Sequence, residues 1–453
     1  MQDLTQGPIP KHVLRMAAPI MVGMLFQTLY FLIDLYFVAR LGDAAVAGVG
    51  AAGNVQFIVM ALTQILGVGT MALISHAVGR KDRDDANLVF NQSLLLALAC
   101  TAVTLVGGYA LGGAYMRTLG ADAATTQAGI DYLYWFLPGL ALQFAQIAMG
   151  SALRGTGIAK PTMVVQMLTV VLNAILAPVL IAGWLTGKPM GVAGAGLATS
   201  ISIAAGVVMM ALYFARLEKY VGFDRSQFHA RLEVWKRILR IGLPPGGEFA
   251  LMFVYMAAIY WAIRGFGAEA QAGFGIGQRV MQAIFLPAMA ISFATAPVAG
   301  QNVGARRPER VRATFYASAM IGSVLMLALT ALCQWQPSWL VGVFTQEPAV
   351  IAVGAQFLGV ISLNFVASGL IFTCSGMFQA LGDTLPALLS SASRMLTFAL
   401  PALWLSTRPD FELRQLWLLS VASVALQAVI SVLLLLRALR RADRRMATAA
   451  AAT

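Results

Sequence analysis

A single carboxylate stands inside a long apolar run near the N-terminus. The stretch QTLYFLIDLYFVARLGDAAVAGVG, residues 27–50, carries Asp34 among Leu, Tyr, Phe, Ile and Val side chains. An Asp at the centre of a membrane helix costs about 2.5 to 3.5 kcal/mol on insertion scales, so such residues face a protein interior or an aqueous cavity. Desolvation favours the neutral form of a carboxyl group, whereas a nearby sodium ion favours the charged form. Asp34 is therefore a candidate site for a proton or a sodium ion.

Two further polar side chains precede Asp34 on the same helical face. Tyr30 and Gln27 lie four and seven residues earlier, a spacing that brings side chains together along an α-helix. Pro19 lies farther down the same run, where a missing backbone hydrogen bond can kink a helix. We therefore expect a polar cluster around Asp34, on a helix that bends at Pro19 as a hinge.

A second acidic residue, Glu248, lies in a later apolar run. A carboxylate in such a place attracts a cationic substrate or carries a second proton. The structural alternative is an ion pair with Arg394, which lies in another apolar run. The three His and three Cys residues are isolated from one another, with no CxxC spacing. We therefore expect no metal site, no disulfide and no cofactor other than the coupling ion.

The composition indicates which elements carry these side chains. Of 453 residues, 59% are hydrophobic and 11% are charged, whereas a soluble domain carries roughly 25% charged residues. Apolar runs of about 20 residues, long enough to cross a bilayer core, recur along the whole chain. Twelve such runs follow one another: residues 13–39, 54–78, 88–112, 129–153, 162–185, 192–214, 238–263, 281–303, 314–333, 349–370, 387–405 and 416–436. The sequence therefore predicts an all-α membrane protein with twelve transmembrane helices.

The distribution of basic residues predicts the orientation of these helices. The net charge is +12, and the basic residues gather in the loops on one side of the predicted spans, above all in residues 216–240 and 437–445. The loops of the opposite side hold few of them. This asymmetry is the positive-inside rule, so we expect both termini in the cytoplasm and the chain in the inner membrane of a bacterium. Nucleic acid is not an expected partner, because the charge is explained by topology.

The chain contains an internal repeat with an offset of 225 residues. Without any gap, Pro19 coincides with Pro244, and VLRMAAP at residues 13–19 pairs with ILRIGLP at residues 238–244. Each copy holds six predicted spans, so the two halves have the same orientation and are related by an axis along the membrane normal. Such repeats place a substrate path between halves that rock against each other. Transport is therefore the leading hypothesis.

The predicted domains follow from this repeat. They are an N-terminal six-helix lobe at 1–216, a charged cytoplasmic linker at 217–236, a C-terminal six-helix lobe at 237–436 and a basic tail at 437–453. The stretch GVGAAG at residues 48–53 satisfies the G-x-G-x-x-G pattern of dinucleotide-binding proteins, but no strand precedes it. Small residues that let helices approach closely explain it better.

Several motifs together resemble the multidrug and toxic compound extrusion (MATE) family. The most specific are residues 27–50, quoted above, and LRGTGIAKP at residues 153–161, with a weaker second copy, FQALGDTLP, at residues 378–386. NAILAPVLIAG at residues 173–183 and GVAGAGLATSIS at residues 191–202 resemble the family's helices five and six. The resemblance covers essentially the whole chain, and its motifs occur in the family's order.

The resemblance implies a fold, an activity and a set of site residues. It implies two six-helix lobes around a central cleft, and export of organic cations or other amphipathic compounds driven by inward flow of protons or sodium. By the same resemblance, Tyr30, Tyr132, Asn173 and Thr199 match polar positions that surround the family's first-helix acid. Ordinary hydrogen bonds between helices are the alternative role for the two tyrosines and for Thr199.

The chain departs from the family's patterns at acidic positions. The DinF-like branch carries a second carboxylate four residues after the position of Asn173, but Ala177 stands here. The NorM-like branch carries acids in helices seven and ten, whereas residues 358–380 contain none and Glu248 does not clearly match the acid of helix seven. A lone Asp34 with few anionic partners favours protons over sodium as the coupling ion.

Two other functions remain open on the sequence alone. A lipid-linked saccharide flippase or another metabolite exporter of the same superfamily predicts a more basic central cleft and often additional helices. A membrane-embedded transferase predicts clustered acids or a His-centred nucleophile, and the acids of residues 82–85 lie in a predicted loop. We therefore expect a transporter and not an enzyme, with small organic molecules and membrane lipid as its partners, acting as a monomer.

Overall fold

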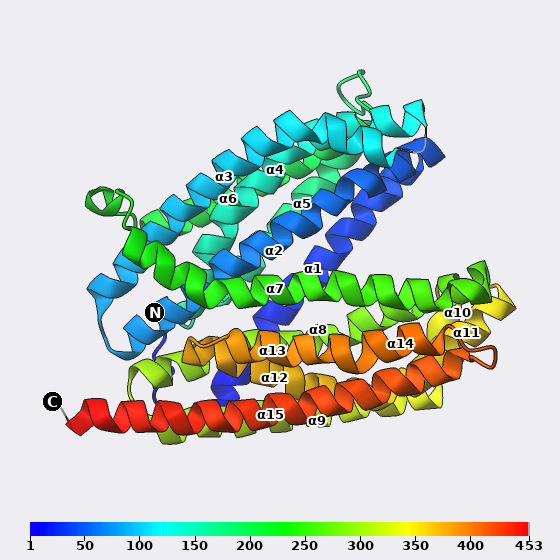
Figure 1. Ribbon diagram of the computed structural model, residues 1–453. Helices are drawn as coiled ribbons and strands as arrows, with labels where there is room; N and C mark the ends of the chain where they lie inside the picture. Colours follow the sequence, from blue (N-terminus) through cyan, green and yellow to red (C-terminus); the bar gives the residue numbers. More distant parts are fainter. Residues whose placement is uncertain (121, 452–453) are drawn as a thin grey trace. The chain divides into compact units, whose positions relative to one another are not determined.

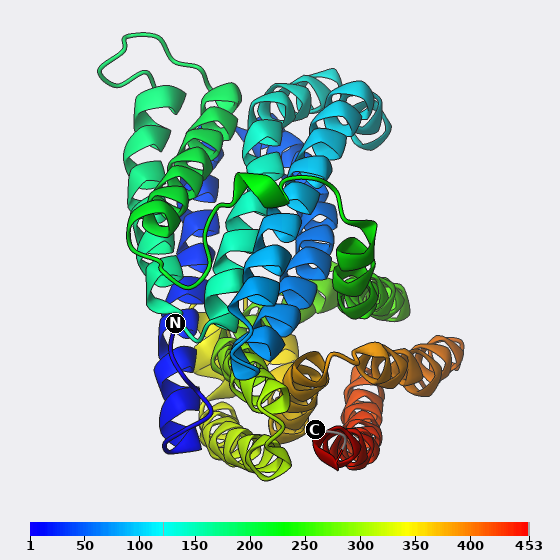
Figure 2. The same cartoon turned by 90° about the vertical axis from the view of Figure 1, so that its left-hand side faces the viewer.

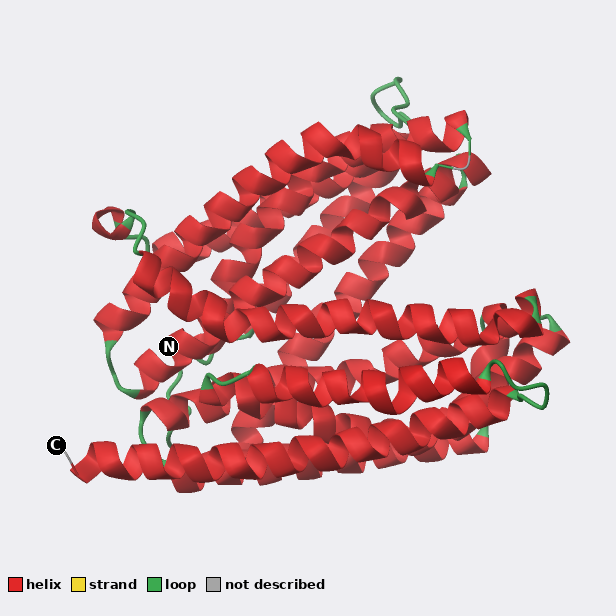
Figure 3. Ribbon diagram, in the orientation of Figure 1, coloured by secondary structure: helices red, strands yellow, loops and turns green. Residues whose placement is uncertain are grey.

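The computed structural model describes residues 1–120 and 122–451, and its regular structure there is helical throughout (Figures 1 and 3). Among these residues no strand occurs. The α-helices are α1 (Ile9–Ala39), α2 (Asp43–Gly79), α3 (Arg83–Leu119), α4 (Ala123–Gly155), α5 (Lys160–Ile181), α6 (Val192–Arg216), α7 (Leu232–Ile263), α8 (Ala268–Gly304), α9 (Pro308–Trp335), α10 (Pro337–Gly342), α11 (Pro348–Ile361), α12 (Phe365–Leu381), α13 (Leu385–Arg394), α14 (Leu400–Leu405) and α15 (Leu413–Ala451).

The twelve predicted spans are confirmed. In the described part of the chain, twelve helical segments are long and apolar enough to cross a membrane. Two of them contain two α-helices each, because α11 continues into α12 and a π-helical turn, Met395–Ala399, joins α13 to α14. Three helices differ most from the predicted bounds. Helix α2 begins at Asp43 and not at residue 54, α8 begins at Ala268 and not at residue 281, and α15 continues to Ala451 beyond residue 436. The glycine-rich stretch at 48–53 is helical, and Gly48 within it lies against another helix.

Gly48 and its counterpart in the second repeat bring helices together at equivalent places. A Cβ atom added to Gly48 of α2 would lie 2.7 Å from the backbone nitrogen of Gly129 in α4. At the repeat distance of 225, a Cβ atom on Gly354 of α11 would lie 3.2 Å from the backbone oxygen of Gly273 in α8. Only residues without a side chain permit such an approach between membrane helices. The structure therefore shows the expected packing role for Gly48, whereas Gly50 and Gly53 have no atom within 4 Å of an added Cβ atom.

The chain forms two compact units, and two helices are divided between them. The first unit contains residues 1–3 and 22–242, and the second contains residues 4–21 and 243–453. The expected lobes were contiguous in sequence, whereas the start of α1 packs with the second unit and the start of α7 packs with the first. Prolines lie close to both divisions, with Pro19 inside α1 and Pro244 inside α7.

The start of α7 packs closely on α2 within the first unit. A Cβ atom on Gly242 would lie 1.8 Å from the backbone oxygen of Ile65, and a Cβ atom on Gly69 would lie 2.2 Å from that of Ile238. The two contacts are reciprocal, because each helix presents a glycine to a carbonyl group of the other. The backbones of α2 and α7 therefore touch here without side chains between them.

The link between α6 and α7 is fastened to α3. It runs across the helices of the first unit (Figure 2), and α7 begins at Leu232, inside the stretch 217–236 that we expected to link the lobes. Asn91 of α3 donates to the backbone oxygen of Gly222 at 2.9 Å. Gln92 donates to the backbone oxygens of Gln227 and His229 at 2.7 and 2.9 Å. Two buried amide side chains thus hold the linker in place.

The N-terminal segment is held within the second unit. Leu4 is fully buried, and its backbone nitrogen donates to Oε1 of Gln301 at 2.9 Å. Arg307 donates to the backbone oxygen of Thr5 at 2.7 Å, and Arg310 donates to that of Gly7 at 3.0 Å. Side chains at the end of α8 and the start of α9 therefore satisfy backbone groups that precede α1.

Candidate functional site

The first unit buries five polar side chains that we singled out from the sequence. Asp34 and Tyr30 lie on α1, Tyr132 on α4, Asn173 on α5 and Thr199 on α6. Their exposed fractions are 8%, 9%, 4%, 0% and 2% respectively. Asp34 therefore points into the protein, as its cost in lipid requires.

The hydroxyl groups of two tyrosines approach the Asp34 carboxylate. Tyr132 donates a long hydrogen bond of 3.5 Å to Oδ2 of Asp34. The Tyr30 side chain lies beside both Asp34 and Thr199, although neither its hydroxyl nor that of Thr199 makes a hydrogen bond of good geometry. The carboxylate thus has one weak protein donor and two aromatic neighbours.

Several polar atoms of these five buried residues lack partners. Oδ1 of Asp34, the hydroxyls of Tyr30 and Thr199, and both amide atoms of Asn173 are buried without a hydrogen bond. Buried polar groups in folded proteins are almost always paired, so each exception needs an explanation such as a bound ion or water. Hydroxyl, amide and carboxylate oxygens are ligands for hard cations, and a carboxylate also takes a proton. The arrangement can therefore accept either ion.

Small residues on α6 position these side chains. A Cβ atom on Gly196 would lie 2.5 Å from the backbone oxygen of Tyr132, so α6 touches α4 at this level. Thr199 follows three residues later and shares the α6 face that meets α4. In the other direction, a Cβ atom on Gly206 would lie 2.9 Å from the Thr169 hydroxyl of α5. Asn173, one turn beyond Thr169, is thereby held beside the same helix.

Two residues that we associated with Asp34 lie outside this cluster. Gln27, two turns before Asp34 on α1, is exposed. Apolar residues lie on every side of α1. The spacing from Asp34 therefore does not predict which turns of α1 are covered by neighbouring helices. Pro19 is buried inside α1 and lies two residues before the position where α1 passes from the second unit to the first. The expected hinge therefore coincides with a division between units.

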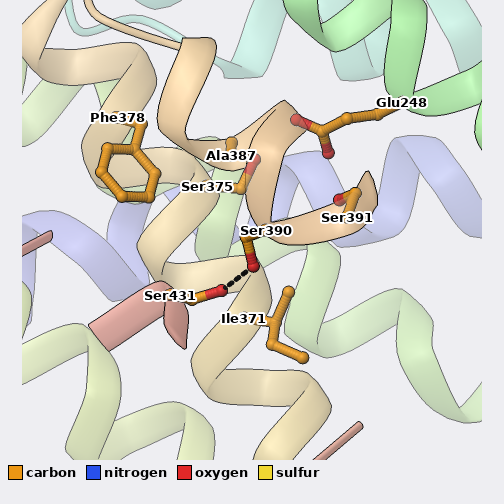
Figure 4. Close-up of a pocket in the computed structure, with 8 residues that line it drawn as sticks. All are labelled: Glu248, Ile371, Ser375, Phe378, Ala387, Ser390, Ser391 and Ser431. Carbon is orange, nitrogen blue, oxygen red and sulfur yellow. Dashed lines mark hydrogen bonds between the residues drawn. The ribbon is translucent and has the colours of Figure 1, made fainter. Parts of the chain in front are cut away.

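Glu248 borders a small cavity in the second unit (Figure 4). Its carboxylate lies beside the hydroxyl of Ser391, and its Oε1 is buried without a hydrogen-bond partner. The cavity has a volume of about 10 Å³, roughly the space that one water molecule occupies. Its polar wall comes from four helices and consists of Glu248, Ser375, Ser390, Ser391 and Ser431.

Arg394 does not pair with Glu248. Its guanidinium carbon lies 3.9 Å from the centre of the Tyr255 ring, and its Nη2 donates to the Tyr255 hydroxyl. That hydroxyl also bonds Ser420 at 3.1 Å. No ion pair among the described residues includes either Glu248 or Arg394. The structural alternative for Glu248 is therefore wrong, because an aromatic face holds the guanidinium instead.

The Asp34 cluster is not duplicated by the repeat. At the offset of 225, Tyr30 corresponds to Tyr255, but Asp34 corresponds to Ile259 and Asn173 to Phe398. Ile259 and Phe398 belong to the apolar core of the second unit. The two halves therefore share a scaffold, and only the first carries this cluster.

The sequence did not predict the serines around Glu248. Single serines are common in membrane helices, where they bond their own backbone. A signal was present on α15, where Ser420, Ser423, Gln427 and Ser431 recur at helical spacing in an apolar run. All four are buried, with exposed fractions of 4%, 3%, 5% and 2%. A polar stripe of this kind marks a helix face that packs against protein.

Comparison with known proteins gives a family match in both halves. The MatE family model matches residues 19–179 and 244–405, two segments that begin at the repeat distance. The chain is 27% identical over 422 residues to "Probable multidrug resistance protein YpnP" of Bacillus subtilis, covering 92% of this chain and 91% of that protein. It is 27% identical over 447 residues to "Probable multidrug resistance protein NorM" of Thermotoga maritima, covering 94% and 92%.

Solved structures agree with this match. An outward-facing multidrug resistance MATE family transporter of the MOP superfamily is similar with a TM-score of 0.90 and 26% identity, covering 97% of this chain and 98% of that one. A MATE in its bent conformation has a TM-score of 0.92 at 25% identity, covering 98% of both chains. A MOP superfamily transporter from Pyrococcus furiosus, whose reverse pocket polarity suggests a different function for it, has a TM-score of 0.87 at 25% identity, covering 97% and 98%.

Proposed function

Because the chain belongs to the MatE family of multidrug efflux transporters, we propose that it exports amphipathic or cationic organic compounds in exchange for a cation bound at Asp34. Membership of a family of transporters excludes the transferase that the sequence left open. The observation that carries the proposal is a buried carboxylate, 8% exposed, whose Oδ1 has no hydrogen-bond partner.

The coupling ion that we propose is a proton. The polar neighbours of Asp34 are the neutral hydroxyls of Tyr30 and Tyr132, and Thr199 lies beside Tyr30. Sodium is a hard cation that is bound where several oxygens together replace its hydration shell. A carboxylate with neutral neighbours in a desolvated place takes up a proton more readily. Sodium stays the alternative, since the first unit also buries oxygens of Asn173 and Thr199 that have no hydrogen-bond partner.

Ion binding at Asp34 is coupled to helix α1. Residues 4–21 of α1 pack with the second unit and residues 22–39 pack with the first. Pro19 removes one backbone hydrogen bond near this division, which makes bending easier there. An ion at Asp34 changes the charge and contacts of residues 22–39 of α1, which pack with the first unit. Bending at Pro19 then changes the position of residues 4–21 of α1, which pack with the second unit. Occupancy thus selects between conformations of different ion affinity.

The proposed setting is the inner membrane of a bacterium with both termini in the cytoplasm. The asymmetry of basic residues between loops supports this orientation. Exposed apolar side chains along the spans, such as Val103 and Val106 at 72% each, suit contact with lipid tails. We propose that the transporter acts as a monomer, since each chain carries both repeats and its own ion site.

The test is transport in proteoliposomes, with pH and sodium gradients imposed separately. We expect wild-type export of a fluorescent organic cation to follow the pH gradient, and Asp34→Asn to abolish it while the protein still inserts and purifies normally. Asp43→Asn is a matched control, because Asp43 is an exposed acid at the start of α2. Export by Asp34→Asn at the wild-type rate would refute the proposal, and export that follows only the sodium gradient would reverse the choice of ion.

A further inference from the structure

A cationic side chain lies in the middle of a membrane span of the second unit. Arg394 belongs to the 21-residue span Leu385–Leu405, near its centre. An arginine at the centre of a bilayer is costly, so it faces the protein interior or a water-filled path and has a partner or a function there. Arg394 is only partly buried. Its open side therefore faces water and not lipid tails.

The guanidinium of Arg394 is held in one orientation by Tyr255 of α7. It lies over the Tyr255 ring, and its Nη2 donates to the Tyr255 hydroxyl. That bond leaves the hydroxyl proton of Tyr255 free to be donated to Ser420 of α15, at 3.1 Å. The Phe398 ring packs on the other ring, with the two centres 4.7 Å apart. Residues of three segments thus fix the group in place.

Most hydrogen-bonding groups of this guanidinium have no acceptor. A guanidinium carries five N–H donors and no acceptor atom. Within the described part of the chain, Arg394 is bonded only to the Tyr255 hydroxyl, and its Nε is buried without a partner. A buried polar group that lacks a partner needs an explanation. The missing partner is a hydrogen-bond acceptor, and an anion would balance the charge as well.

Glu248 does not supply this anion. It lies beside Ser391, one turn before Arg394 on α13, yet none of the ion pairs between described residues joins the two. Arg394 therefore keeps its positive charge without a counter-ion from its own unit.

The backbone next to Arg394 is irregular in a way that the first unit does not share. A π-helical turn, Met395–Ala399, begins directly after it, whereas the equivalent residues 170–174 of α5 are α-helical. Such turns inside α-helices occur frequently at functional sites. At the offset of 225, Tyr255 corresponds to Tyr30, which lies beside Asp34. The same tyrosine of the scaffold thus accompanies a carboxylate in the first unit and a guanidinium in the second.

We propose that Arg394, supported by Tyr255, binds the carboxylate group of an amphipathic substrate, so that the exported compounds include zwitterions and organic anions. A guanidinium holds a carboxylate through two parallel N–H···O bonds, a geometry that a single hydroxyl acceptor cannot satisfy. Because Nε is enclosed, the planar group has to turn on the Tyr255 ring before the second bond forms. The export of such compounds rests on the proposed function, whereas their binding does not.

The experiment compares two dyes that differ in one group. Rhodamine B carries a free carboxylate, and its ethyl ester has the same aromatic cation without that charge. Binding of each dye to the purified full-length protein is measured by equilibrium dialysis, with protein-free detergent micelles as the blank. We expect Arg394→Gln to weaken rhodamine B binding by roughly tenfold or more, the loss typical of a hydrogen bond to a charged group. Binding of the ester should stay unchanged.

Three further variants separate recognition from structure. Arg394→Lys keeps the charge but loses the two-point geometry, so its affinity for rhodamine B should lie between those of wild type and Arg394→Gln. Tyr255→Phe keeps the ring and removes the hydroxyl that orients the guanidinium, and it should also weaken rhodamine B binding selectively. Arg408→Gln is the matched control, because Arg408 is an exposed arginine of the same unit, stacked 3.9 Å from the centre of the Trp404 ring. It should bind both dyes like wild type.

Equal weakening of both dyes in Arg394→Gln would mean that Arg394 only supports the fold, and the proposal would be wrong. Unchanged rhodamine B binding would also overturn it, since a buried water would then be the partner of Nε. Failure of the proposed function gives a different result. In that case, selective binding of rhodamine B persists, but a pH or sodium gradient drives export of neither dye from proteoliposomes.

Discussion

Gly242 provides a direct test of the contact between α2 and α7. The substitution Gly242→Ala places a Cβ atom 1.8 Å from the backbone oxygen of Ile65 and 2.6 Å from its carbonyl carbon. Ordinary contact begins at 3.4 Å, so the two backbones must separate by about 1.6 Å, the difference between 3.4 Å and 1.8 Å. No flexible side chain can move aside, because the obstructing atoms belong to the main chain of α2.

The expected cost follows from two opposing effects. Inserting a methyl group into a closely packed interior costs about 1 to 3 kcal/mol, and the rigid surroundings place this case at the upper end. Replacing Gly by Ala inside a helix contributes about 1 kcal/mol in the opposite direction. We therefore expect Gly242→Ala to lower the free energy of unfolding by about 2 kcal/mol, a change of roughly thirtyfold in the folding equilibrium.

The assay is reversible unfolding in mixed detergent micelles, with Gly50→Ala as the control. Gly50 lies inside α2 with no atom within 4 Å of an added Cβ, so this variant receives only the gain in helix propensity. We expect the two variants to shift stability in opposite directions. Equal stability of Gly242→Ala and Gly50→Ala would refute the reasoning, since it would mean that α7 does not touch α2 at Gly242.

Two further predictions concern the first unit: the hydrogen bond to Asp34 and the N-terminal cap of helix α4. Tyr132→Phe removes the donor to Asp34; we expect normal folding and a changed pH dependence of export, and an unchanged pH profile would contradict this. The Asp122 cap of α4 has a pKa below 3.8, because the backbone and side chain of Thr125 donate to it. Its stabilisation is present above pH 3.8 and is lost as the pH falls through the lowered value. Asp122→Ala should therefore lower the unfolding temperature at neutral pH but not in strong acid. Asp122→Asn is the control, because an Asn side chain still caps the helix. An equal decrease in the unfolding temperature of Asp122→Ala at both pH values would contradict this.

The number of spans and the repeat could be predicted from the sequence because both depend on local composition. Apolar runs of sufficient length must become helices in lipid, since every backbone group there needs an internal partner. The division of α1 and α7 between the compact units could not be predicted in this way. It depends on which helices pack together in three dimensions, and the sequence marks it only by Pro19 and Pro244 near the divisions.

The burial of Asp34 was predictable because an isolated carboxylate in lipid is costly whatever its neighbours are. The cavity beside Glu248 was not, because it is assembled from serines of three other helices that are each unremarkable alone. Glu248 and Arg394 were expected as possible partners, since opposite charges in apolar runs attract. The aromatic ring of Tyr255 holds the guanidinium of Arg394 instead. The sequence does not show that this ring lies close enough to compete with the Glu248 carboxylate.

The sharing of α1 between the two units has a consequence for synthesis. Residues 4–21 are translated well before the rest of their unit, whose remaining residues begin at 243. During translation this segment therefore waits for its packing partners while more than two hundred residues are added behind it. If the chain is cut in the linker and the two halves are expressed separately, each half carries a stretch of helix that belongs to the other unit. We therefore expect neither half to fold stably alone. We expect the two halves to form a folded protein when they are expressed together.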